Sequence, residues 1–523
     1  MAKKKTKAVV DNIADFGVDT AKGGVIFTTA SIIRAIGTLA LLIILARLLQ
    51  PANYGLYAII IALSGLLGLN TDFGVGSALK KKLPEAKTNY RILELINNAY
   101  FGAVSIAIVI AIIGIIFSGY IATNIYKNAI LTYPIIIGVV AIIFSTLFSA
   151  TMSSLLGLRK NKEAGIGYIT YSLSQLIAST ILVLFGYGIF GALTGLLISL
   201  IIAFLITFTF LLKHIKYKII KPTKDVLKEL FGFSTPIFAS NAISNGTLNL
   251  GVILLGAVAS PFIVGNYGAA VKLGSFAEVI IIAITQVLLP TYSYAASNKK
   301  LAEKSESIFN SSIYYTLLIL LPLLVYFISI SNQLIFIFLS KSYIFAPFYF
   351  SIVAVGIVTG IVFRYGGTLV ISYGKVKAYT IYIIGTAMIV IVLLTVLTPT
   401  FKVYGVLLAL YIIGPILYDI AFLRFMSNEL HVNFSWDKPL KIVLAVIIIL
   451  PLLLYINTII SHGRYIMVIN AIITLVLYPP ILALLKGIDN DNLKFVESIS
   501  NKLHVNFIMK YLFDYTKIFM SRQ

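Results

Sequence analysis

Six charged side chains fall inside long apolar runs of the sequence, where an ionisable group is costly. They are three cations and three carboxylates: Arg34, Lys272, Arg364, Asp72, Glu278 and Asp419. Such residues usually face the interior of a helix bundle or a watery cavity, and they mark substrate and ion pathways. A cavity that carried the three cations would attract an anion such as a phosphate or diphosphate. The planar fork of an arginine suits this best, because it can hold two phosphate oxygens.

The same charges have a structural interpretation as ion pairs, either Arg34 with Asp72 or Lys272 with Glu278. Lys272 and Glu278 are six residues apart, which places them on different faces of one helix. The cavity interpretation is therefore favoured for the cations. Asp72 and Glu278 are the candidates for binding a coupling ion, a proton or sodium.

Three asparagines, Asn241, Asn245 and Asn249, recur every four residues and share one helical face. Such a stripe could bind the hydroxyl groups of a sugar. It could equally join neighbouring helices, at about 0.6 kcal/mol per hydrogen bond, and the sequence leaves both open. For the serines of nearby runs, such as Ser172 and Ser179, we expect helix–helix bonding.

Signals of catalysis are missing from the sequence. There is no cysteine, no glycine-rich loop ending in Lys-Ser/Thr, and no cluster of metal-ligand types. The four histidines fall in predicted loops or in the tail: His214, His431, His462 and His504. We therefore predict no catalytic residue, no metal and no cofactor, and a protein that is not an enzyme.

The elements that position these residues are predicted to be membrane-spanning helices. The chain is 59% hydrophobic and 11% charged, whereas a soluble domain is roughly a quarter charged. Since a span needs about 20 apolar residues, the sequence predicts an all-α polytopic membrane protein of about fourteen transmembrane helices. The predicted spans are 22–48, 53–79, 91–119, 130–156, 164–186, 189–213, 228–258, 263–293, 306–330, 347–373, 377–398, 402–426, 438–459 and 463–486. A short apolar piece at 331–347 is expected to be interfacial or re-entrant.

Basic residues lie between these apolar runs. We therefore attribute the net charge of +22 to the topology of the chain in the membrane and to contact with membrane lipids, and we expect no nucleic acid partner. Lysines and arginines gather in alternate connections when the N-terminus is placed in the cytoplasm, as the positive-inside rule requires. We therefore expect a multi-pass protein of the plasma membrane with both termini in the cytoplasm. The tail from about residue 493 has apolar residues every three or four positions, which favours an amphipathic helix on the membrane surface.

An internal repeat divides the chain. Pro51 and Tyr54-Gly55 correspond to Pro261 and Tyr267-Gly268, and the later pairs Tyr187-Gly188 and Tyr404-Gly405 also match, at offsets of 210 to 217 residues. A repeat of six spans is even, so it predicts a parallel repeat of two six-helix lobes about an axis along the membrane normal. The expected parts are an N-terminal cytoplasmic segment (1–21), an N-lobe (22–213), a cytoplasmic linker (214–227), a C-lobe (228–426), two extra C-terminal helices (438–486) and a cytoplasmic amphipathic tail (487–523).

Two stretches near the first predicted turn resemble a known family. They are Ala46-Arg47-Leu48-Leu49-Gln50-Pro51, with Asn53-Tyr54-Gly55 following, and Asp72-Phe73-Gly74-Val75-Gly76-Ser77-Ala78. This pattern resembles the oligosaccharide flippases of polysaccharide biosynthesis, in the multidrug/oligosaccharidyl-lipid/polysaccharide exporter superfamily. The resemblance implies alternating-access transport of a polyprenyl-diphosphate-linked oligosaccharide from the cytoplasmic to the outer leaflet. It also implies a cationic central cavity, for which Arg34, Lys272 and Arg364 are the candidates.

Two other functions stay open. A cation-coupled multidrug antiporter of the same superfamily would need carboxylates in the membrane, and Asp72, Glu278 and Asp419 are available. A membrane scaffold within a glycan-assembly complex would need no charges at membrane depth.

Overall fold

The computed structural model describes residues 2–72, 74–215, 218–297, 304–460, 465–494, 497 and 515–519. Within these residues every regular element is a helix, and they contain no strand. The chain forms two compact units. Unit 1 comprises Met1–Ala269 with Thr395–Val403, and unit 2 comprises Ala270–Leu394 with Tyr404–Gln523.

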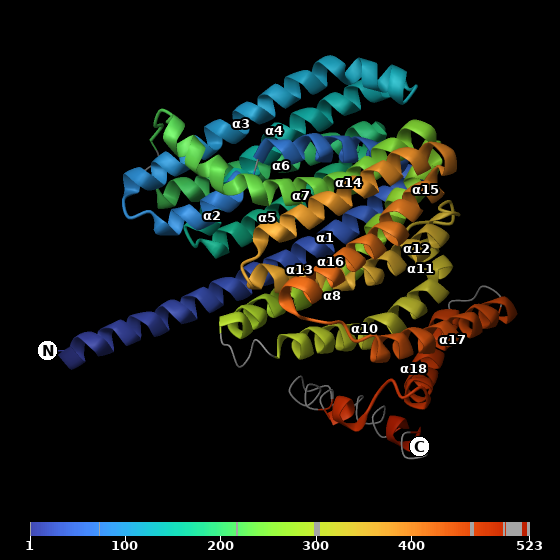
Figure 1. The fold of residues 1–523 in the computed structure, drawn as a ribbon. Helices are drawn as coiled ribbons and strands as arrows, with labels where there is room; N and C mark the ends of the chain where they lie inside the picture. The colour runs from blue at the N-terminus through green and yellow to red at the C-terminus, as the bar shows by residue number, and fades with distance from the viewer. Residues whose placement is uncertain are drawn as a thin grey trace. The chain divides into compact units, whose positions relative to one another are not determined.

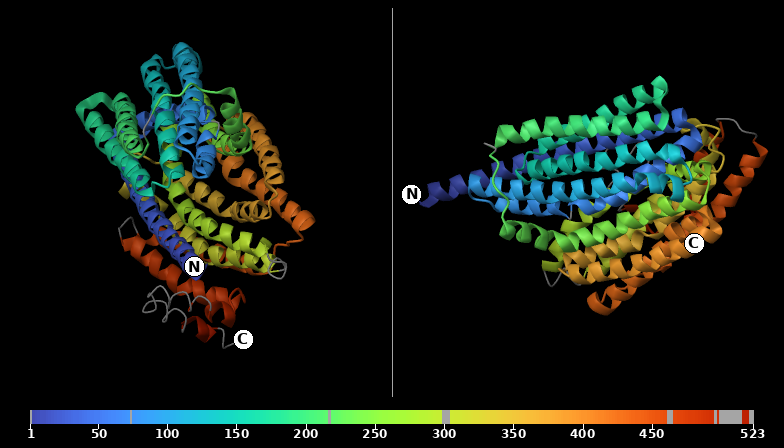
Figure 2. Two further views of the ribbon diagram at one scale, coloured as in Figure 1. Left: turned by 90° about the vertical axis from the view of Figure 1, so that its left-hand side faces the viewer. Right: turned by 90° about the horizontal axis from the view of Figure 1, so that it is seen from above.

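Unit 1 holds the first seven long helices and the first turns of an eighth (Figure 1). In chain order its helices are α1 (Ala2–Asp72), α2 (Val75–Glu85), α3 (Asn89–Tyr120), η1 (Ile121–Ile125), η2 (Ala129–Leu131), α4 (Thr132–Gly157), α5 (Asn161–Leu182), η3 (Val183–Tyr187), α6 (Gly188–His214), α7 (Lys224–Val258) and the start of α8 (Pro261–Ser297). The α3 and α4 helices run side by side in both views of Figure 2.

The α1 helix is two membrane helices joined at a sharp reversal (Figure 1). Gln50 has φ 61° and ψ 167°, outside the helical region, and Pro51 disfavours a helical conformation in the residue before it. The Gln50 side chain donates from Nε2 to the carbonyl of Arg47 at 2.6 Å, which satisfies one acceptor that the interrupted helix leaves open. The predicted boundary between the first two spans is thus confirmed.

The α5 and α6 helices form an antiparallel pair packed through glycines. A Cβ at Gly195 would lie 2.4 Å from the backbone nitrogen of Ser179, and one at Gly167 would lie 2.4 Å from the Thr207 side chain. The Ser179 hydroxyl donates to the carbonyl of Ala192 at 3.1 Å. These positions leave no room for a side chain, so glycine allows the two helices to approach this closely.

Ten stretches of the described residues are long and apolar enough to cross a membrane. Two of them, Ile26–Leu69 and Asn161–His214, have 44 and 54 residues, about twice the length of one span. Each contains a break, at Gln50 and at the π-helical segment η3. The α7 and α8 helices, of 35 and 37 residues, are also long enough to cross a membrane, so the described helices have the length that fourteen predicted crossings require.

Unit 2 holds the remainder of α8 and most residues of the later helices. These are α10 (Ser305–Ser329), α11 (Ser331–Phe338), α12 (Ala346–Thr359), α13 (Ile361–Ser372), α14 (Val376–Phe401), α15 (Val403–Leu407), η4 (Leu408–Ile413), α16 (Gly414–Leu430), α17 (Asp437–Ile459) and α18 (Tyr465–Leu484). The last turns of α14 and the first residue of α15 belong to unit 1. The short α11 helix lies in the segment for which an interfacial piece was predicted. Most of the predicted tail helix lies outside the described residues.

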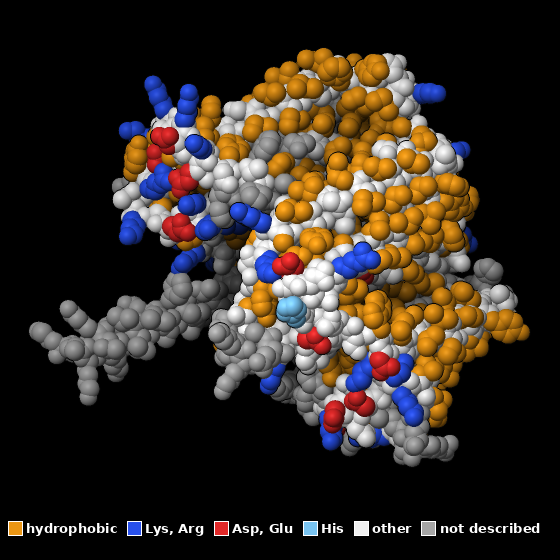
Figure 3. Space-filling model, viewed as in Figure 1, with side chains coloured by type: hydrophobic (Ala, Val, Ile, Leu, Met, Phe, Trp, Pro, Cys, Tyr) orange, Lys and Arg blue, Asp and Glu red, His pale blue; other side chains and the backbone are white. Residues whose placement is uncertain are grey.

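Large apolar side chains cover much of the outer surface (Figure 3). Along α3, Ile116 and Phe117 are 70% and 53% exposed, and along α17 Tyr455 is 64% exposed. In unit 1 the charged side chains gather near the α2–α3 turn (Figure 3), where Glu229 of α7 pairs with Lys82 and Arg91. Exposed apolar surface of this extent suits a protein whose solvent is lipid.

Candidate functional site

Arg34 lies midway along the first arm of α1, with its guanidinium carbon 4.5 Å from the centroid of the Tyr168 ring on α5. Phe27 and Phe148 contact the same ring, with centroids 5.5 and 6.4 Å away. The arginine side chain is exposed. A cation held over an aromatic face keeps its hydrogen-bond donors free at the edge, so Arg34 can bind an anion in the fork of its guanidinium.

The backbone around Arg34 is fixed by α5. The Ser172 hydroxyl is 3.4 Å from the carbonyl of Arg34, and a Cβ at Gly37 would lie only 2.2 Å from that hydroxyl. Ser172 and Ser179 therefore both act between helices, the role expected for them. This close packing sets the position of the Arg34 side chain.

Two of the predicted asparagines lie on the described part of the α7 surface. Asn245 is exposed and Asn249 is half-buried. Asn249 packs against α1, since a Cβ at Gly65 would lie 3.0 Å from its Nδ2 atom. The side chains of Asn241 and Asp72 lie outside the described residues. The stripe thus has one member on a helix contact and one on an open surface.

In unit 2, Arg364 of α13 pairs with Glu278 of α8, with 2.8 Å between Nη2 and Oε1. Both side chains are about a third exposed, at 31% and 32%. Lys272, six residues before Glu278, is exposed, and no salt bridge of the described residues includes it. Glu278 therefore pairs with Arg364 and not with Lys272, the partner in the ion-pair interpretation of the sequence.

The tenth predicted span is broken. Gly360, with φ −83° and ψ 16°, separates α12 from α13. The Phe363 N–H belongs to the first turn of α13, where backbone donors have no partner inside the helix. It donates to Oδ1 of Asp419 on α16 at 2.7 Å. Asp419 thus caps, from a neighbouring helix, a break at membrane depth.

Asp419 is the residue whose role sequence reasoning missed. The pattern did show a carboxylate in the twelfth span, but the break at Gly360 could not be inferred from its apolar surroundings. A glycine inside a hydrophobic segment, beside a carboxylate on another span, is the signal that would have indicated a discontinuous helix. Among the described residues, no group of three or more metal-ligand side chains exists.

The helices and these charged groups at membrane depth define a polytopic α-helical membrane protein, and solved structures share its fold. The chain is similar to the lipid II flippase MurJ in its inward closed conformation, with a TM-score of 0.72, 18% identity, and coverage of 92% of this chain and 99% of that one. It is also similar to an inward-facing multidrug resistance MATE family transporter of the MOP superfamily, with a TM-score of 0.63, 14% identity, and coverage of 76% and 94%.

The sequence comparisons identify the family. Residues 44–346, more than half of the chain, match the model of the family described as polysaccharide biosynthesis protein. The chain belongs to this family. Among named relatives, the multidrug export protein MepA of Staphylococcus aureus (strain MRSA252) is 23% identical over 371 residues, which cover 66% of this chain and 79% of the relative. MepA of Staphylococcus saprophyticus is 26% identical over 257 residues, 47% and 56% of the two chains.

Proposed function

We propose that the protein is a flippase that carries a polyprenyl-diphosphate-linked oligosaccharide from the cytoplasmic to the outer leaflet of the plasma membrane. Its family and its similarity to a lipid II flippase support this class of substrate. The termini are cytoplasmic, and the two six-helix lobes, 22–213 and 228–426, alternate in access. The protein acts as a transporter without a catalytic step or a cofactor.

The observation that carries the proposal is the exposed guanidinium of Arg34 over Tyr168. A diphosphate needs cationic partners once it leaves water, since an unpaired charge is costly at membrane depth. Lys272 is a second exposed cation, and Arg364 adds its charge beside Glu278. An organic cation would be repelled by such groups.

Each part of the substrate has a matching part of the chain. Arg34 and Lys272 bind the phosphates, while Asn241, Asn245 and Asn249 bond the sugar hydroxyls. The polyprenyl tail stays in lipid, next to the helix pair at 438–486. A proton or sodium gradient supplies the energy.

The test is flipping of a fluorescent polyprenyl-diphosphate oligosaccharide in proteoliposomes that contain this protein alone. Arg34→Ala should slow flipping at least tenfold, which corresponds to about 1.4 kcal/mol, and Arg34→Lys should retain part of the rate. Tyr168→Leu should have an intermediate effect. Lys402→Ala, which removes an exposed cation in the turn before α15, is the matched control. Wild-type flipping in Arg34→Ala would refute the assignment of the anion site.

A multidrug antiporter is the second candidate, because the named relatives are multidrug export proteins. It would use Glu278, Asp419 and Asp72 to bind organic cations. Uptake of a fluorescent lipophilic cation that is lost in Glu278→Gln, and is unaffected in Arg34→Ala, would favour this function over the flippase.

A further inference from the structure

The α12–α13 break is held by the carboxylate of Asp419. The described residues include an ion-pair partner for Glu278 but none within salt-bridge distance of Asp419. Among the described residues, its hydrogen-bond donor is the backbone N–H of Phe363. Carboxylates at membrane depth mark ion and proton pathways in transporters, and Asp419 is the unpaired member of this charged group.

We propose that Asp419 binds the coupling proton, and that proton binding releases the cap on α13. The inference rests on the proposed transport function. As a carboxylate, Asp419 accepts a charge-assisted hydrogen bond from Phe363. As a neutral acid it becomes a donor and a weaker acceptor, so α13 is no longer fixed to α16 at this point.

The helices around Asp419 are arranged so that this bond controls the break. Residues of α12 and α13 contact residues that lie 55 or 56 positions later, in η4 and α16. The contacts run from Gly356 with Tyr411 to Phe363 with Asp419. A Cβ at Gly356 would lie 2.5 Å from Tyr411, so α12 is packed tightly onto η4. A Cβ at Gly360 would make only ordinary van der Waals contact, 3.6 Å from the Cβ of Pro415, so the break between α12 and α13 is packed less tightly than Gly356 and is the point where a released α13 would bend.

The charged groups near Asp419 are few. From α13, Arg364 acts on it electrostatically, and the charge of Arg364 is balanced by Glu278 of α8. The titratable side chains on the helices packed around this joint include five tyrosines: Tyr365 on α13, Tyr418 on α16, Tyr379 and Tyr382 on α14, and Tyr411 on η4. With Asp419 ionised, the three charged side chains carry one net negative charge, and proton binding neutralises them.

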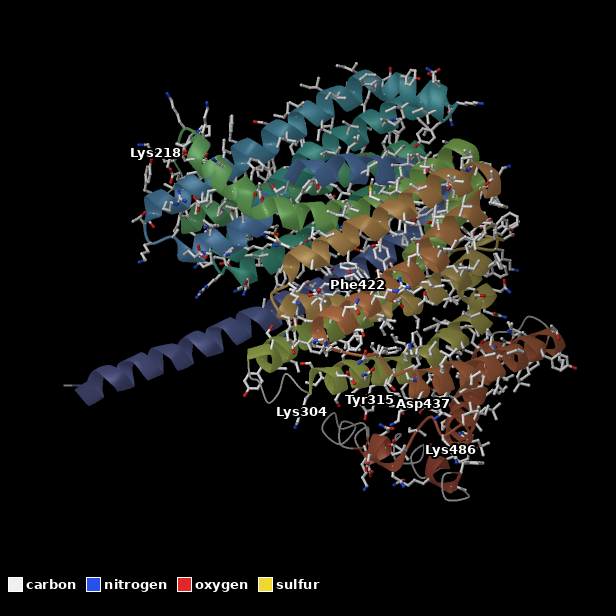
Figure 4. The ribbon with its side chains drawn as sticks, in the orientation of Figure 1. Lys218, Lys304, Tyr315, Phe422, Asp437 and Lys486 are labelled. Carbon is white, nitrogen blue, oxygen red and sulfur yellow. The ribbon has the colours of Figure 1, made fainter. Side chains whose placement is uncertain are left out.

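Aromatic packing adjoins the proton site on α13, α14 and α16. Phe422, one turn after Asp419 and labelled in Figure 4, contacts the rings of Phe363 and Tyr379, with centroids 4.9 and 5.7 Å apart. The carboxylate thus lies beside an apolar cluster, and a change in its charge alters the electrostatics at this joint.

Two measurements test the proposal, and the first requires no transport. Infrared difference spectra on acidification should show the carbonyl band of a protonated carboxylic acid. Asp419→Asn should remove that band, and the control Glu429→Gln, which removes a carboxylate near the end of the same helix, should keep it. An unchanged band in Asp419→Asn would overturn the proposal, even if flipping is normal.

The second measurement separates coupling from transport. Asparagine resembles the neutral acid, since it is a weaker acceptor for the Phe363 N–H than a carboxylate, but it cannot exchange a proton. Asp419→Asn should therefore still equilibrate the lipid-linked oligosaccharide between leaflets at equal pH, while a pH gradient no longer accelerates flipping. Wild-type stimulation by the gradient in Asp419→Asn would refute the proton site. A wild-type protein that does not flip this lipid, yet shows an Asp419-dependent band, would refute the proposed substrate and leave the proton site supported.

Discussion

Asn98 and Asn310 make the same hydrogen bond in two different places. The Oδ1 atom of Asn98 accepts the backbone N–H of Thr223, just before α7, at 2.8 Å. The Oδ1 atom of Asn310 accepts the backbone N–H of Ser435, just before α17, also at 2.8 Å. Asn310 lies 212 residues after Asn98, and Ser435 lies 212 residues after Thr223. Each asparagine thus fixes the chain after one repeat at the point where the next helix begins.

Removing these side chains should destabilise the protein. Asn98 is fully buried, so Asn98→Ala leaves the Thr223 donor without its partner, and we expect a loss of about 1–3 kcal/mol. Asn98→Asp keeps the acceptor for Thr223 but buries a carboxyl group that faces the carbonyl of Glu94, so its loss should be at least as large. Thermal unfolding in detergent, followed by circular dichroism, measures both. Thr400→Ala, which removes only bonds within an exposed helix turn, is the control, and an equal melting temperature in Asn98→Ala and the control would contradict this role.

The sequence predicts the helices well, because an apolar run of membrane length has few alternatives. The reversal at Gln50-Pro51 also follows from local chemistry. What cannot be predicted is which distant side chain meets a given backbone group. The Asp419–Phe363 bond depends on the break at Gly360, and the partner of Glu278 turned out to be Arg364, 86 residues away. Such pairings are set by the packing of whole helices, which hydropathy does not specify.

The contact between Gly37 and Ser172 gives a second prediction. A methyl group at Gly37 would come 2.2 Å from the Ser172 hydroxyl, while the Ser172 Cβ is 3.4 Å away. Gly37→Ala should therefore destabilise the protein by about 1–3 kcal/mol, and Ser172→Ala in the same chain should restore most of it.

Gly195 provides a matched comparison, in which the corresponding serine substitution should not restore stability. A methyl group there meets the backbone nitrogen and Cα of Ser179, at 2.4 and 2.5 Å. Removing the hydroxyl in Ser179→Ala leaves those atoms in place, so it should not rescue Gly195→Ala. Melting temperatures of the two single and two double variants decide this, and rescue at both sites would show that helix spacing is adjustable.

The segment after α18 should detach from α17 in acid. Lys438 donates to Asp489 at 2.6 Å, and Asn492 donates from its backbone N–H to the same carboxylate at 2.8 Å. Partial burial raises the pKa of Asp489, but the bonds from Lys438 and Asn492 outweigh it and hold the pKa below the ordinary value of 3.8.

Because the folded-state pKa is depressed, the contribution of Asp489 to stability is fully present above the ordinary value. It is lost as the pH falls through the folded-state pKa. Pepsin cleavage after residue 486 should therefore increase steeply below about pH 4, the ordinary range for aspartate. In Asp489→Asn the segment should be cleaved more readily than in the wild type above about pH 4 and should lose this dependence, whereas Asp491→Asn should behave as the wild type. A steep acid dependence that survives in Asp489→Asn would assign the effect to another group.

The last prediction concerns a reciprocal contact between α1 and the first turns of α8, both within unit 1. A Cβ at Gly55 would lie 1.9 Å from the carbonyl oxygen of Pro261, and one at Gly265 would lie 1.8 Å from that of Pro51. In each partner the glycine follows the proline by four residues, as Gly55 follows Pro51 and Gly265 follows Pro261. Such a contact, made by backbone alone, can open and close without rearranging side chains.

A disulfide can lock this contact, since the chain has no cysteine of its own. A Cβ added at Gly268 would lie 3.2 Å from the Cβ of Ala58, near the 3.5–4.5 Å that a disulfide requires. Oxidation of the double variant Ala58→Cys/Gly268→Cys should remove both thiols from maleimide labelling. It should also stop flipping until a reductant is added, because alternating access would move the two halves of the repeat apart here. Ala58→Cys/Gly119→Cys, whose second position has no neighbour within 4 Å, should keep both thiols. Full flipping by the oxidised Ala58→Cys/Gly268→Cys protein would mean that this contact stays closed throughout transport.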